Sequence, residues 1–280
     1  MNIRIVTDSA CDLPDGAAGQ HKIEIVPLYI NIEGKSYLDI VEITRNEFYQ
    51  RLPACHELPT TAAPSPASFL QAYEKLADEG ADEIISIHIS SSLSRTIDSA
   101  HEAAREFHRI PVHVIDSDQL SLGAGYVVLA AAKAVAQGKS MNEVLHVISN
   151  ISARTYVFAA VETLRYLSKS GRMHVTMAKI GTLLRIKPLL KMNRGKPEAE
   201  RVRTNEGAIR RLITLVEHLG PLEKLSLVHT YAYDRIEILY ERARHLFPEG
   251  NIPDWINVTP VLGTHLGPGV IGFAAVQKES

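Results

Sequence analysis

The clearest hydrophobic pattern in the chain is the run Ile84–Ile89, in which four isoleucines lie within six residues. A near-continuous β-branched run of this length is typical of a strand that is covered on both faces of a parallel sheet. The hydroxyl-rich stretch Ser90–Thr96 follows at once, and Ile97, Ala100 and Ala104 then recur at helical spacing. The pattern predicts a central strand, a polar loop and a helix, in this order.

Strands and helices alternate along the rest of the first half. Apolar runs predict strands at residues 3–7, 23–32 and 112–115. Helical spacing of apolar residues predicts helices at residues 44–52, around Phe69 to Leu76, at 122–136 and at 141–153. The proline-rich residues 58–66 predict a loop. Such alternation is typical of an α/β fold with a doubly wound, mostly parallel sheet.

The second half is less regular and indicates an α+β domain. The polar turn Asn193-Arg194-Gly195-Lys196 between two extended runs predicts a β-hairpin. Further helices are predicted at residues 164–169, 178–184, 206–219 and 234–246, and further strands at 225–230, 256–261 and 270–276. We place the boundary so that residues 1–153 form the α/β domain and residues 154–280 form the α+β domain.

Composition and charge exclude several classes of protein. A chain of 280 residues with 45% hydrophobic residues is long enough for two globular domains. Neither a membrane-spanning run of about 18 apolar residues nor a secretory signal is present, so we expect a cytoplasmic protein without an integral membrane segment. A formal net charge of −2 argues against nucleic-acid binding. Cys11 and Cys55 fit no disulfide framework, and no metal site is expected.

Familiar catalytic motifs are absent or incomplete. The sequence contains neither a phosphate-binding GxxxxGK[ST] loop nor a GxSxG nucleophile elbow. Residues 267–272 match GxGxxG, but the eight residues that follow leave no room for the helix and strand of a dinucleotide site. Hydroxyl groups, one histidine and one arginine in separate loops could instead converge on an anion.

Eight segments in order along the chain carry a family resemblance: IVTDSACDLP, VPLYINIEGKSYLDIVEITRNEFYQRL, PTTAAPSP, ISSSLSRT, VHVIDSDQLSLGAGY, LSKSGR, IKPLL with RVRT, and GTHLGPGVIGFA. Together they resemble the DegV family of bacterial fatty-acid-binding proteins. The resemblance implies two domains with a ligand tunnel between them, which holds a long-chain fatty acid with its carboxylate at the mouth. It also implies a partner, an ATP-dependent fatty acid kinase that converts the carboxylate to an acyl phosphate for phospholipid synthesis. No cofactor is expected, and this chain would bind rather than catalyse.

The resemblance also assigns roles to individual residues. It places Thr61, Ser94 and His265 at the carboxylate, with Thr60 and Ser92 beside them, and it places Arg172 and Arg203 near the edge for phosphoryl transfer or kinase docking. Two hydroxyl donors and an imidazole N–H would stabilise a desolvated carboxylate through charge-assisted hydrogen bonds without a full counter-charge.

Simpler interpretations stay open for these residues. Thr61 could cap the following helix, His265 could be an ordinary loop histidine, and both arginines could be solvated surface charges. Arg95 stands where the family usually has glycine, so it would be strained if the position needs a positive φ, and otherwise it would add a cation close to the proposed carboxylate. A competing function is a Ser/His hydrolase or acyltransferase that acts on a lipid ester through Ser94 and His265.

Overall fold

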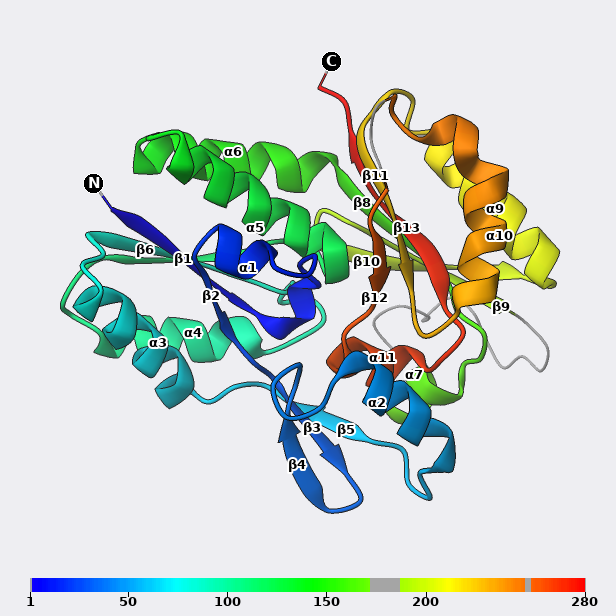
Figure 1. Cartoon of the computed structure of the whole chain (residues 1–280), viewed down its shortest axis with the longest axis horizontal. Helices are drawn as coiled ribbons and strands as arrows, with labels where there is room; N and C mark the ends of the chain where they lie inside the picture. The colour runs from blue at the N-terminus through cyan, green and yellow to red at the C-terminus, as the bar shows by residue number, and fades with distance from the viewer. Residues whose placement is uncertain (1, 172–186, 250–252, 280) are drawn as a thin grey trace.

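The computed structural model describes residues 2–171, 187–249 and 253–279, so Arg172 and the helix predicted at 178–184 lie outside the described residues. Two main sheets with helices between and around them form the molecule, with a small sheet at one end (Figure 1). Among the described residues, no helix is both long and apolar enough to cross a membrane.

The first main sheet is parallel and covered on both faces. Its strand order is β2-β1-β6-β7, from β2 (Ile23–Val26), β1 (Ile3–Asp8), β6 (Glu83–His88) and β7 (Val112–Asp116). Helices α3 (Pro66–Asp78) and α4 (Thr96–Glu106) pack on the face that carries Val6 and Ile84. Helices α5 (Ser121–Ala136) and α6 (Met141–Arg154) cover the face that carries Ile5 and Ile85. The prediction of a doubly wound sheet is therefore confirmed.

The second main sheet is mixed, with strand order β10-β9-β8-β13-β11-β12. Its strands are β8 (Thr155–Ala160), β9 (Lys187–Asn193), β10 (Lys196–Val202), β11 (Leu222–His229), β12 (Trp255–Asn257) and β13 (Ile271–Gln277). All pairs are antiparallel except β11 with β12. The predicted hairpin joins β9 to β10, and Arg194 and Gly195 both have the positive φ that a tight hairpin turn requires.

Helix α5 lies between the two main sheets (Figure 1), where it contacts β1 on one side and β8 and β13 on the other. Its alanine-rich sequence suits this place, since a helix buried all round needs apolar residues on every face. A Cβ atom at Gly125 would lie 2.5 Å from the carbonyl oxygen of Cys11, so glycine permits the close approach of α5 to the loop after β1.

The remaining helices surround these layers. They are α1 (Ala17–Gln20), α2 (Arg45–Arg51), α7 (Arg165–Lys169), α9 (Asn205–Glu217), α10 (Tyr233–Ala243), α11 (Pro260–Leu266) and the 3-10 turns η1 (Ser9–Cys11), η2 (Leu52–Ala54) and η3 (Arg244–Leu246). Helices α9 and α10 cover the outer face of the mixed sheet through Leu212, Ile236 and Leu239.

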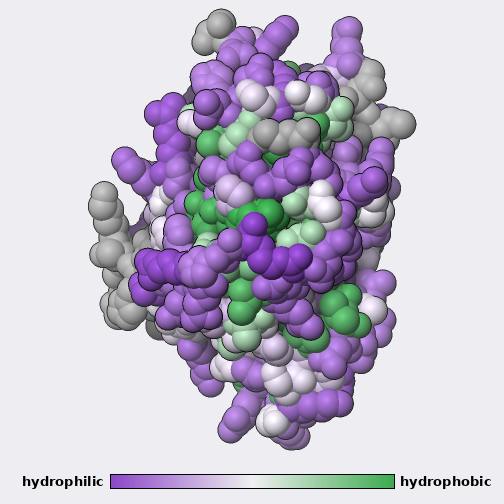
Figure 2. All heavy atoms as spheres, turned by 90° about the vertical axis from the view of Figure 1, so that its left-hand side faces the viewer, coloured by the Kyte–Doolittle hydropathy of each residue, from purple (hydrophilic) through white to green (hydrophobic). Residues whose placement is uncertain are grey.

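Seen from the side of the parallel sheet, the surface is mostly hydrophilic, with hydrophobic residues gathered near its middle (Figure 2).

Three predictions about local structure were wrong. The extended run at 23–32 divides into β2 and β3 (Tyr29–Ile32), which belong to different sheets. The proline-rich loop contains strand β5 (Thr60–Ala62), which pairs with β3 in a small sheet that β4 (Lys35–Leu38) completes. The strand predicted at 256–261 ends at Asn257, because Pro260 begins helix α11 instead of continuing the ladder.

Candidate functional site

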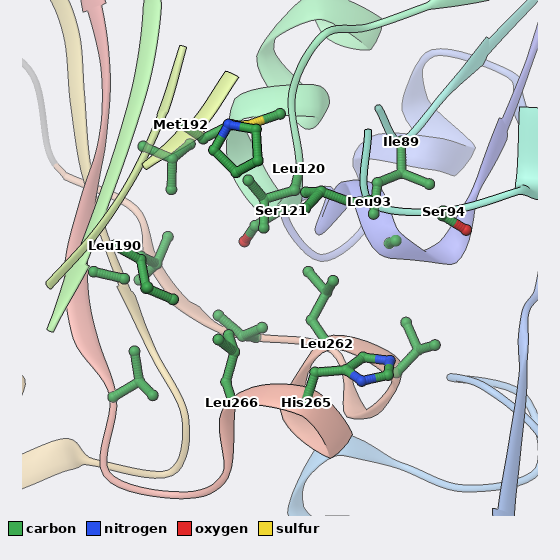
Figure 3. A pocket seen from close by; sticks show the side chains of 18 of the residues that line it. Ile89, Leu93, Ser94, Leu120, Ser121, Leu190, Met192, Leu262, His265 and Leu266 are labelled. Atoms are coloured by element: carbon green, nitrogen blue, oxygen red, sulfur yellow. The ribbon is translucent and has the colours of Figure 1, made fainter. Parts of the chain in front are cut away.

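An apolar cavity of about 120 Å³ lies between the halves of the molecule (Figure 3). Its wall includes apolar side chains from the loops after β6 and β7, from β9 and from α11, namely Ile89, Leu120, Leu190, Met192 and Leu262. Apart from a few polar residues, its lining is hydrophobic, so the cavity suits an alkyl chain better than a polar molecule.

Thr61 and His265 meet on this wall. The Oγ1 atom of Thr61 lies 2.9 Å from Nε2 of His265, although 204 positions separate the two residues in the sequence. Because side chains alternate along strand β5, Thr60 points the other way, is exposed, and accepts a hydrogen bond from Asn31 Nδ2 at 3.4 Å. Thr60 is therefore not part of the cavity wall.

Ser94 also lines the cavity, at the end of the polar loop that follows β6. Its Oγ atom lies 2.9 Å from Thr96 Oγ1 and accepts a hydrogen bond from the Thr96 backbone N–H. Ser92 bonds instead to Ser90 Oγ at 3.0 Å and lies outside the cavity wall. Ser94 and His265 lie on one side of the cavity, opposite Leu190 and Met192 (Figure 3). Ser94 and His265 therefore share one side of a mostly apolar wall.

Two buried carboxyl groups fix the start of helix α11, which carries His265. The backbone N–H of Thr259 donates to Asp12 Oδ1 at 2.7 Å, and its hydroxyl donates to Asp39 Oδ2 at 2.6 Å. Asp12 also accepts a hydrogen bond from Ser121, whose side chain lines the cavity. Burial raises the pKa of both carboxyl groups, that of Asp39 to about 7. These contacts tie His265 to the parallel-sheet half.

The fold and most of the sequence match proteins that are already known. The model of the DegV family matches residues 2–278. The chain belongs to the DegV family. A DegV domain-containing protein of Streptomyces coelicolor is 34% identical over 280 residues, which cover 99% of each chain.

Solved DegV structures share the whole fold. A DegV family protein from Thermus thermophilus, described as fatty-acid-binding, is 34% identical with a TM-score of 0.88 over 99% of this chain and 100% of its own. DegV from Bacillus subtilis, a fatty acid binding protein, is 29% identical with a TM-score of 0.88 and the same coverage. The arrangement of two main sheets with helices between and around them is therefore the DegV fold.

The structure decides between alternatives that the sequence left open at Arg95 and Thr61. Arg95 has a φ of −91°, so the position that is usually glycine in the family needs no positive φ here and the arginine is not strained. Its exposed side chain pairs with Asp98, three residues along α4, and lies outside the cavity wall. Ser65, not Thr61, caps helix α3, since the Ser65 side chain accepts from the Ser68 N–H. Helix capping therefore does not explain Thr61.

Of the two arginines assigned to phosphoryl transfer, Arg203 is not among the residues that line the cavity. Arg203 is exposed in the turn after β10, and Arg172 lies outside the described residues. Sequence reasoning missed two polar residues that do line the cavity, Ser121 and Lys191. Lys191 forms ion pairs with Glu198 and Glu200 at 2.9 Å each, so its charge is already neutralised. No spacing in the sequence marks either residue, because each reaches the cavity through the tertiary fold.

Hydrolase geometry is missing at the cavity. Within the described part of the chain, no hydrogen bond joins Ser94 to His265, whose Nε2 atom is bonded to Thr61. A closer match to a catalytic triad lies in the core, where His88 contacts Asp8 Oδ2 at 3.1 Å and Ser86 Oγ at 2.7 Å. All three side chains are fully or almost fully buried, so no substrate reaches them.

The absence of a side chain at Gly263 allows α11 to pack tightly against α2. A Cβ atom there would lie 2.3 Å from the hydroxyl oxygen of Tyr49, a buried residue that donates to the Val258 carbonyl. We expect Gly263→Ala to cost about 1–3 kcal/mol in unfolding free energy and to move His265 away from Thr61, which weakens ligand binding. Urea denaturation and ligand titration would measure both effects.

The matched control for this change is Gly19→Ala. A Cβ atom at Gly19 would meet nothing within 4 Å, and the residue lies in helix α1. Alanine should therefore be neutral or slightly stabilising at Gly19. Equal stability of the two variants would show that α11 does not depend on the close approach at Gly263.

The raised pKa of Asp39 makes stability depend on pH. With a pKa of about 7, folded Asp39 keeps a proton that the unfolded chain loses above about pH 4. Its contribution to the unfolding free energy therefore falls as pH rises from about 4 to about 7, by up to roughly 1.4 kcal/mol per pH unit. Burial lowers the pKa of His229 to about 4, which gives the opposite slope between about pH 4 and 6.5.

The Asp39→Asn variant separates the two contributions to the pH dependence of stability, since it removes that of Asp39 and keeps that of His229. The unfolding free energy of the variant minus that of the wild type should therefore increase from about pH 5 to about pH 8. Urea denaturation at both pH values would measure this change. A stability difference that stays constant with pH would contradict the raised pKa of Asp39.

Proposed function

We propose that this chain binds a long-chain fatty acid, with the carboxylate at Thr61, Ser94 and His265 and the acyl chain in the apolar cavity. The observation that carries the proposal is that Thr61, Ser94 and His265 line one side of a cavity whose wall is mostly hydrophobic. The DegV relatives described as fatty-acid-binding support the same ligand class.

Most of the affinity would come from the acyl chain. Burial of each methylene contributes roughly 0.8 kcal/mol, so a chain of about sixteen carbons has about 12 kcal/mol of gross apolar driving force before ordering costs. The carboxylate needs hydrogen-bond donors chiefly to offset its desolvation. Hydroxyl and imidazole donors do this without a buried cation, so the carboxylate keeps its reactivity.

We further infer that the bound fatty acid is presented to a separate ATP-dependent kinase, while this chain carries out no catalysis. Ser94 and His265 do not form the hydrogen bond that a Ser/His nucleophile would need, which supports a binding role. Arg203 is exposed, so it is accessible to a partner protein or to a transferred phosphoryl group.

Mass spectrometry of lipids extracted from the denatured, purified protein tests the binding proposal. We expect about one equivalent of fatty acid per chain. A protein that is empty and takes up no added fatty acid would refute the proposal.

The kinase step is tested by adding ATP and a fatty acid kinase to the loaded protein and trapping acyl phosphate with hydroxylamine. Formation of the product, reduced by Arg203→Ala, is the expected result, and no product with an active kinase would refute presentation.

A further inference from the structure

A second cavity, of about 620 Å³, opens on the surface and shares no lining residue with the fatty-acid cavity. Its wall combines the loop after η1, the start of α2, and the ends of β11 and β12 with the start of α10. Strands β11 and β12 are parallel, and His229 pairs with Asn257 where both end. The carboxyl ends of parallel strands are a usual place for ligands in α/β proteins.

His229 offers an unused donor to this cavity. The residue is only 1% exposed, yet its side chain lines the cavity. Its Nδ1 atom accepts a hydrogen bond from the Ala232 backbone N–H at 3.2 Å, which places the ring proton of the neutral imidazole on Nε2. Among the described residues, Nε2 has no hydrogen-bond partner, and the ring of Tyr233 packs against the imidazole at a centroid distance of 4.7 Å.

Arg45 supplies a positive charge beside the same cavity. Among the described residues, its guanidinium group forms only long ion pairs, at 3.6 Å to Asp12 and 3.5 Å to Asp15, and Asp15 is fully exposed. Its Nε atom is buried without a hydrogen-bond partner in the described part of the chain. In addition, α10 begins at Tyr233, and its N-cap residue Ala232 has no side chain that could accept from the first N–H groups of the helix. These donors together favour an anion.

Two exposed aromatic residues, Tyr233 and Trp255, line this cavity, and the Trp255 ring also packs against Tyr240 at a centroid distance of 5.3 Å. Trp255 is 40% exposed and Tyr233 is 49% exposed, whereas most large apolar side chains of the described chain are buried. Exposed rings beside a polar cavity are suited to stack on a planar group of a ligand. The carboxylates of Asp15 and Asp254 are exposed at the rim, where they repel additional negative charge and can accept hydrogen bonds from hydroxyl groups.

We propose that this second cavity binds a small organic phosphate with a planar ring, of the nucleoside monophosphate class. The phosphate contacts Arg45 and His229, the ring stacks on Trp255, and Asp254 accepts from sugar hydroxyl groups. The two rim carboxylates select against di- and triphosphates, since each further charge lies closer to them. The size of the cavity is within the usual range of small-molecule sites.

Trp255 is the single tryptophan of the chain, so its fluorescence reports on this cavity alone. We expect adenosine monophosphate to change the fluorescence in a saturable way at concentrations up to about 5 mM, and adenosine without phosphate to bind about tenfold more weakly. Absence of a saturable change, or equal binding of adenosine, would overturn the proposal.

Three variants test the assigned residues. Arg45→Gln should weaken binding of adenosine monophosphate about tenfold or more. Asp15→Asn should strengthen it, because it frees the guanidinium group and removes a repelling charge at a fully exposed position. Arg51→Gln is the matched control, since Arg51 lies on the same helix, pairs with Glu47 and does not line the cavity.

Each result decides for or against the site. Unchanged binding in Arg45→Gln, or an equal loss in Arg51→Gln, would overturn it. If Arg45→Gln does not fold, as circular dichroism would show, then Asp15→Asn decides, and unchanged or weaker binding by that variant overturns the proposal.

Discussion

Replacement of both Ser94 and His265 by alanine is expected to reduce copurified fatty acid to a small fraction and to weaken binding of a sixteen-carbon fatty acid at least about 100-fold. Each residue would supply a charge-assisted hydrogen bond to the carboxylate, worth about 1.5–3 kcal/mol. The apolar wall stays intact, so residual binding should come from the acyl chain alone. Mass spectrometry of extracted lipid and direct titration would measure the loss.

The fold provides matched controls for this variant. Ser92 shares the polar loop with Ser94 and lies outside the cavity wall, and Thr60 neighbours Thr61 on β5 with its side chain exposed. Ser92→Ala and Thr60→Ala should therefore retain normal binding. If these two variants lose as much affinity as the double variant, the carboxylate is bound elsewhere.

Ala159→Phe is expected to abolish binding of long-chain fatty acids while leaving the protein folded. Ala159 lies on β8 and lines the apolar cavity. A phenyl ring at this position would fill part of the space that the acyl chain is proposed to occupy. Exclusion of about five methylenes corresponds to roughly 4 kcal/mol, or about a thousandfold in affinity.

Chain length is the most direct check on this second variant. Titration with fatty acids of decreasing length should show that Ala159→Phe penalises long chains more than short ones, whereas Ala67→Phe, at an exposed position of α3, should bind all of them normally. Unfolding by urea should show little change, because the ring enters an existing cavity. Wild-type affinity of Ala159→Phe for the longest chains would place the acyl chain outside this cavity.

Local sequence patterns predicted the helices and strands that are long, have a periodic hydrophobic pattern or end at a recognisable turn. The Ile84–Ile89 run became β6 and its continuation, and Arg194-Gly195 formed the predicted hairpin turn. Strand β5 could not be predicted in the same way, because three residues in a proline-rich stretch become a strand only when β3, about thirty positions earlier, pairs with them. The short helix α11 likewise depends on its packing against Tyr49.

The site was predictable only in part for the same reason. Family motifs named Thr61, Ser94 and His265, and all three line one cavity. Sequence spacing alone could not bring Thr61 and His265 together, since the contact depends on β5 and α11 being placed side by side by the fold. Ser121 and Lys191 carry no local signal. Their positions follow from the close packing of α5 and the β9–β10 hairpin around the cavity.

The buried Ser86, His88 and Asp8 side chains have a consequence for methods that assign enzymes by three-dimensional templates. Their hydrogen-bond distances, 2.7 Å and 3.1 Å, resemble those of a serine hydrolase. Tyr73 donates to the Ser86 hydroxyl and helps to enclose it. A template scored on interatomic distances alone would therefore return a false positive from this core, and a serine-directed fluorophosphonate would leave Ser86 unlabelled. Access to solvent, rather than triad geometry, separates a structural serine network from a reactive one.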